Sequence, residues 1–262
     1  MPTFLQELIA TTDTRWKEVE LLIEEADKHD AGSDMYDSLC RSTSILMISH
    51  MEGFIKGLVK SLVDDLNRHL SFSEFPVPAK EAVAASYYSA AMSDEKDFRK
   101  FQASLIQTLE GVSDFEANVD AFLFGGNSNK NPKPDMVSQA LRKFGVRDVF
   151  KNLHGSSYED VFESPRAAKR RLSLLHRIVS RACDAFPYSA SLTKSSGLIT
   201  SNYQGQTVWH EFLNNINSHR HQIVHGNTFE NTTTVRDLRS TIINVRLFQL
   251  LVVYVVCAQL SP

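Results

Sequence analysis

The residues best suited to chemistry are concentrated in one short stretch, Asn217-Ser218-His219-Arg220-His221-Gln222-Ile223-Val224-His225-Gly226-Asn227. Three imidazoles and one guanidinium lie within seven residues there. Imidazole titrates near neutral pH and can transfer protons, whereas a guanidinium can stabilise the negative charge that develops on a phosphate. The stretch is therefore the candidate site of acid–base chemistry at a phosphodiester.

The pair His221 and His225 allows three interpretations. A histidine just before Gly226 could bind the last carbonyls of a helix, where a cation is favoured. The spacing of four residues also suits a metal, but Gln222 stands where a zinc-protease helix has its glutamate, and no third ligand is evident. In the third interpretation, a histidine moves a proton during attack by the 2′-hydroxyl of RNA, which needs no metal. We expect neither a metal nor another cofactor.

One helix does not direct the whole motif at one point. At about 100° per residue, Arg220 and His225 leave a regular helix in directions about 140° apart. Either the helix is distorted at Gly226, or the working site combines residues from two chains.

The elements that carry these residues are predicted from apolar positions spaced three and four residues apart. The motif ends a helix at about 207–226. Further core helices are expected at about 4–29, 35–70 and 234–260, with a basic helix at about 165–186. No strand pattern is present. The predicted fold is all-α: a single domain, 1–262, built as a bundle of four long helices.

Residues about 71–164 are expected to form an insertion that carries shorter helices. Prolines, glycines and asparagines interrupt the helical pattern there. The shorter helices are predicted at about 79–92, 94–110, 115–124 and 135–144.

Composition limits the class of protein. The chain has 262 residues, 42% of them hydrophobic, and a net charge of -3, so a large core is expected and RNA contact must come from local basic patches. Three widely spaced cysteines indicate buried thiols rather than a disulfide framework. The N-terminus has no basic segment before an apolar run, and the apolar run Leu247–Leu260 is short for a membrane span. A cytoplasmic protein is expected.

Two long helices each carry one charged residue within an apolar stripe, Glu52 and Arg220. Because an unpaired buried charge is costly, we predict that they pair with each other. The pair could be purely structural. Alternatively, Glu52 could orient Arg220 so that its remaining N–H groups face a phosphate.

The segment Arg220-His221-Gln222-Ile223-Val224-His225 resembles the motif of HEPN domains, which is an arginine, a polar residue, three residues and a histidine. HEPN domains are all-α bundles that include many RNases. On the second helix, His50-Met51-Glu52-Gly53-Phe54 resembles the corresponding segment of bacterial HEPN-like nucleases from toxin–antitoxin and antiviral defence loci. The resemblance covers the two N-terminal and the two C-terminal helices.

The resemblance implies a metal-independent RNA endonuclease, usually a homodimer whose two motifs face each other across a cleft. Arg220 and His225 would be catalytic, with His221 as the supporting polar residue of the motif and Glu52 as a weaker candidate. The expected partners are an RNA substrate, a second copy of the chain, and an antitoxin or defence-system protein. The alternative is a noncatalytic HEPN module that binds a nucleotide or a protein.

A second segment, Arg171 to His176, also has an arginine and a histidine five residues apart. Leucine follows Arg171 and no helix stop follows His176, so we interpret this match as chance. The surrounding helix concentrates positive charge. It forms either a solvated face or a surface that contacts the RNA backbone, through Arg170, Arg171, Arg177 and Arg181.

Overall fold

The structure is a computed structural model that describes residues 2–88, 95–123, 132–193, 197–198, 203, 205–225 and 233–261. All regular elements in these ranges are helical, so the predicted all-α class is confirmed. Five helices correspond to the predicted long and basic helices, with ends that differ by a few residues. They are α1 (Phe4–Ala26), α2 (Asp34–His69), α7 (Pro165–Ala182), α8 (Val208–Val224) and α9 (Val235–Leu260).

Side-chain caps explain where the long helices begin. A hydroxyl at each N-cap accepts a hydrogen bond from a first-turn N–H, which has no partner within the helix. The capping hydroxyls belong to Thr3, Ser33, Thr207 and Thr234. At α8 the cap is reciprocal, because the Nδ1 atom of His210 accepts from the N–H of Thr207 at 3.0 Å.

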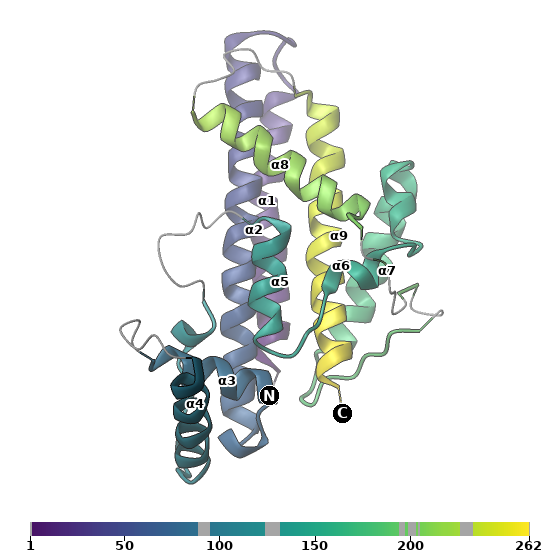
Figure 1. Cartoon of the computed structure of the whole chain (residues 1–262). Coiled ribbons are helices and arrows are strands. Elements are labelled where there is room, and N and C mark those ends of the chain that lie inside the picture. The colour runs from purple at the N-terminus through teal and green to yellow at the C-terminus, as the bar shows by residue number, and fades with distance from the viewer. Residues whose placement is uncertain are drawn as a thin grey trace.

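The helices α1 and α2 form an antiparallel pair, and α9 lies beside them (Figure 1). The motif helix α8 crosses this group obliquely and packs on α2, whereas α7 packs on α9. The start of α8 also touches α9, where the ring centroids of Trp209 and Phe248 are 5.8 Å apart. Of the helices described, α9 alone has the length and apolar composition of a membrane span, but 83% of its most apolar window is buried inside the protein. It is thus the central helix of the core.

In its described residues, the segment between α2 and α7 contains the further α-helices α3 (Val77–Ser86), α4 (Glu95–Glu110), α5 (Pro134–Arg142) and α6 (Val149–Leu153). The helix predicted at about 115–124 is wrong, because only a 3-10 turn at Val119–Ala121 is present. Asn67 of α2 accounts for the difference: its amide exchanges two hydrogen bonds with the backbone N–H and C=O of Ala117, at 2.9 and 3.0 Å. These bonds replace helical ones.

Part of this segment supports the motif helix. Phe150 of α6 stacks on His210, with ring centroids 4.1 Å apart, and on Phe248 of α9 at 5.6 Å. Further along α8, the amide of the buried Asn217 donates to the carbonyl of Pro132, just before α5. These contacts fix the position of α8 from its start to within one turn of the motif.

A buried carboxylate joins the chain's N-terminal end to the bundle. Asp65 of α2 is fully buried and accepts hydrogen bonds from the N–H groups of Phe4 and Leu5 at 2.8 and 3.1 Å, and from the hydroxyl of Tyr188 at 2.8 Å. A carboxylate at the N-terminus of α1 satisfies first-turn N–H groups and interacts favourably with the helix dipole. The cysteines are free and buried, as predicted, at Cys40, Cys183 and Cys257.

Candidate functional site

The motif occupies the last turn of α8 and the residue after it. The side chains of His221 and His225 are exposed and Arg220 is half-buried. The two imidazole rings lie together, with centroids 4.2 Å apart, as expected for residues four apart on a helix. The helix ends at Val224, and Gly226, the predicted stop, lies outside the described residues.

The helix stays regular up to the second histidine. The N–H of His225 still donates to the carbonyl of His221 at 3.1 Å, which is the α-helical pattern. The backbone thus reaches His225 without the distortion that would turn its side chain toward Arg220. Because residues five apart on a regular helix project in directions about 140° apart, we expect Arg220 and His225 of one chain to point away from each other.

Glu52 has a partner on its own helix. Its carboxylate forms an ion pair with Lys56, one turn further along α2, at 2.7 Å. The structure thus gives Glu52 a different partner from the Arg220 that we predicted. The crossing of the helices explains the difference: Met47 and Ile48 share a cavity lining with His219, and Glu52 lies one turn beyond them along α2.

His219 is a third histidine that sequence reasoning left without a role. Its Nε2 atom is 2.8 Å from the hydroxyl of Thr233, just before α9, so it joins the end of α8 to the start of the next helix. Burial lowers its pKa below the ordinary value of 6.5. Burial therefore favours the neutral form of the ring. The signal in the sequence was its position three residues after Ile216, on the side of α8 that packs against the bundle.

Two more histidines are packed into the bundle rather than presented to a substrate. His50 lies edge-on against Trp16, and His210 stacks on Phe150. In both, burial is the main cause of a pKa below the ordinary 6.5. We refer to His50, His210 and His219 as the half-buried histidines.

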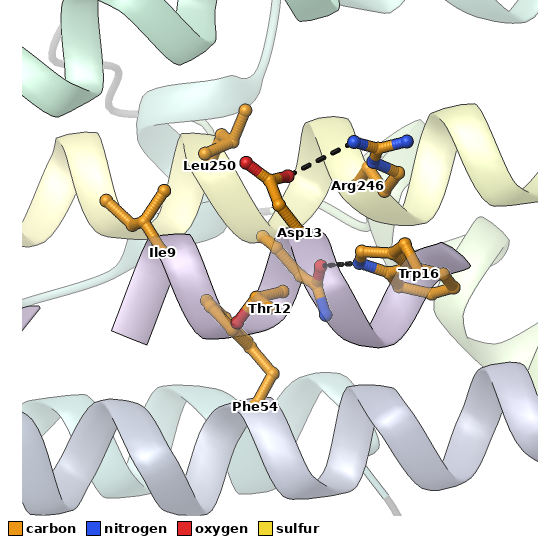
Figure 2. Close-up of a pocket in the computed structure, with 8 residues that line it drawn as sticks. Ile9, Thr12, Asp13, Trp16, Phe54, Arg246 and Leu250 are labelled. Atoms are coloured by element: carbon orange, nitrogen blue, oxygen red, sulfur yellow. Dashed lines mark hydrogen bonds and ion pairs between the residues drawn. The ribbon is translucent and has the colours of Figure 1, made fainter. Parts of the chain in front are cut away.

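The second arginine–histidine match is engaged in packing. His176 Nε2 lies 2.6 Å from Asp13 of α1, and Arg171 binds Asp160 at 3.0 Å. The other oxygen of Asp13 binds Arg246 of α9 at 3.1 Å (Figure 2). His176 and Arg246 thus hold α7 and α9 against α1 through one carboxylate.

The exposed side of α7 remains strongly positive. Arg170, Arg177 and Arg181 are exposed, and we call this set the basic face of α7. Arg171 was predicted to belong to it, but its guanidinium is held by Asp160 and by the hydroxyl of Ser157. Within the described ranges, no group of three or more His, Cys, Asp or Glu side chains is arranged to hold a metal.

An all-α bundle that carries the segment Arg220 to His225 at the end of α8 is the arrangement that the resemblance to HEPN domains led us to expect. The RiboL-PSP-HEPN family (HEPN_RiboL-PSP) matches residues 11–254, so the chain belongs to this family. Comparison with curated proteins and with solved structures gave no match. Membership of a HEPN family indicates an RNase or a nucleotide-binding module.

Proposed function

We propose that the protein is a metal-independent RNA endonuclease whose active site is formed by Arg220, His221 and His225. The observation that carries the proposal is the last turn of α8, where two exposed imidazoles lie 4.2 Å apart and the half-buried Arg220 directly precedes the first of them in the chain. Exposed imidazoles are accessible to a polymer that could not enter a closed pocket.

The chemistry needs no group beyond these side chains. His225 accepts the proton of a ribose 2′-hydroxyl, whose oxygen attacks the adjacent phosphorus. The bond between phosphorus and the 5′-oxygen breaks, and that oxygen takes a proton from a protonated imidazole. Arg220 stabilises the added negative charge on the phosphoryl oxygens. The products are a 2′,3′-cyclic phosphate and a 5′-hydroxyl.

In this proposal the working site combines two copies of the chain. The regular end of α8 supports the idea, because Arg220 and His225 of one copy diverge by about 140°. In a symmetric dimer, the Arg220 of one copy meets the His225 of the other. Mixing Arg220→Ala with His225→Ala protein should then restore cleavage, because mixed dimers contain one intact pair. Two inactive parents that stay inactive after subunit exchange would contradict the shared site.

The proposed setting is a cytoplasmic toxin or antiviral-defence effector that a partner protein restrains. The direct test compares RNA cleavage by wild-type protein, Arg220→Ala and His225→Ala. Both variants should lose cleavage by roughly a hundredfold or more while retaining the helical circular dichroism of the wild type. Gln222→Ala is the matched control, since Gln222 is also exposed on the last turn of α8. Full activity in either motif variant would refute the proposal.

The second candidate is a noncatalytic HEPN module that binds a nucleotide or a protein. The observation that favours it is the divergence of Arg220 and His225 within one chain, which leaves an isolated copy without a convergent catalytic pair. Toxicity on expression discriminates between the two. Growth arrest that His225→Ala relieves supports the nuclease, whereas harmless expression with no RNA cleavage supports the binding module.

A further inference from the structure

A cavity of about 180 Å³ lies where α2, α8 and α9 meet. Asn215, Ile216 and His219 line it from α8. The cavity therefore lies beside the part of α8 that directly precedes Arg220. It is smaller than the ~300–1,000 Å³ of sites that hold drug-sized ligands. Its size suits one small ring system rather than a whole nucleotide.

The cavity walls are apolar, and polar groups stand at their edges. Met47, Ile48, Leu238 and Val245 are buried and supply aliphatic and thioether surface. None of the described lining residues is a lysine or an arginine, so the cavity has no cation for a phosphate. An uncharged ligand with apolar faces is therefore favoured over an anion.

The lining residues also offer polar groups that could bond the edge of a heterocycle. Asn215 is exposed and offers an amide with both donors and an acceptor, and Thr241 adds a hydroxyl from α9. His219 contributes a ring that burial keeps neutral at neutral pH. Proteins that read single-stranded RNA stack an unstacked base on an aromatic ring such as histidine and bond its polar edge. Enzymes that act on a flipped base also hold it between aromatic or apolar side chains.

We propose that this cavity binds one base of the RNA substrate, next to the cleaved phosphate, and gives the enzyme a base preference. The inference rests on the proposed nuclease function. The base enters between α2, α8 and α9, while the charged phosphate stays outside with Arg220, one residue along α8 from His219. An uncharged cavity for the base and a separate cationic group for the phosphate correspond to the two parts of a nucleotide.

Binding can be tested without cleavage, by titrating each of the four ribonucleoside 5′-monophosphates into the full chain in a calorimeter. We expect at least one to bind, and Asn215→Ala to weaken that binding by roughly tenfold or more. Asn214→Ala is the matched control, since Asn214 is also exposed and lies next to Asn215 but does not line the cavity. Thr241→Phe, at a half-buried position, should fill the cavity and abolish binding. No binding by any monophosphate, or binding that Thr241→Phe leaves unchanged, would overturn the inference.

A cleavage map completes the test. Wild-type protein should cut a random RNA with a base preference beside the cut, and Asn215→Ala should flatten that preference while Asn214→Ala preserves it. Monophosphate binding combined with cuts that show no preference would overturn the inference, because the ligand would then be a free nucleotide. Binding that follows the variants while no RNA is cut would support the cavity as a base site and refute the proposed nuclease.

Discussion

Asp65 offers the sharpest prediction about stability. Replacing it with alanine leaves the N–H groups of Phe4 and Leu5 and the hydroxyl of Tyr188 without their acceptor. A hydrogen bond to a charged group contributes about 1.5–3 kcal/mol, and water entering the space would recover part of the loss. We expect Asp65→Ala to lower the free energy of unfolding by about 3–6 kcal/mol, a large share of the ~5–15 kcal/mol that stabilises a typical domain.

The neighbouring residue provides the control. Asp64 pairs with Lys60 near the surface of the same helix, and such pairs contribute about 0–1 kcal/mol. Urea unfolding followed by circular dichroism should show a large loss for Asp65→Ala, a smaller one for Tyr188→Phe, which removes one of the three bonds, and almost none for Asp64→Ala. If Asp65→Ala cost no more than Asp64→Ala, the role assigned to the buried carboxylate would be refuted.

Further predictions concern pH, RNA affinity and packing. The pKa values of the half-buried histidines lie below 6.5 in the folded state, so unfolding takes up protons as the pH falls below that value. The urea concentration at the unfolding midpoint should therefore decrease as the pH is lowered from about 7 to about 5. His219→Gln should make this decrease smaller, and an unchanged pH dependence would contradict the lowered pKa of His219. Replacing all three arginines of the basic face of α7 with alanine should weaken RNA binding. If each arginine contacts a phosphate, the negative slope d log K/d log[salt] should become about 2 units closer to zero. An unaltered salt dependence would show that this face is merely solvated. His176→Ala should lower the melting temperature and leave cleavage per folded molecule unchanged, since His176 binds Asp13; loss of cleavage at full stability would contradict a packing role.

The long helices could be predicted from the sequence because each combines an apolar stripe with a recognisable start. Thr207 and Thr234 cap α8 and α9 within a residue or two of the predicted starts. The helix predicted at about 115–124 failed because the amide of Asn67, distant in sequence, takes up the backbone of Ala117. Local periodicity carries no information about such a contact.

The candidate site was predicted in part. The i, i+4 pairing of His221 and His225 follows from helix geometry, and the structure places their rings together. The partner of Glu52 could not be predicted in the same way, since it depends on where α8 crosses α2. The structure pairs Glu52 with Lys56, which the sequence also places one turn away. The cavity beside His219 is likewise formed by three helices and has no pattern in any one of them.

Product analysis in the absence of divalent metal tests the central claim most directly. Purified protein is incubated with total RNA and transfer RNA in EDTA, with His225→Ala as the control, and the ends of the fragments are identified. The proposed mechanism predicts fragments from wild-type protein alone, each with a 2′,3′-cyclic phosphate at one end and a 5′-hydroxyl at the other. Fragments with 5′-phosphate ends, or equal cleavage by the His225→Ala protein, would contradict it.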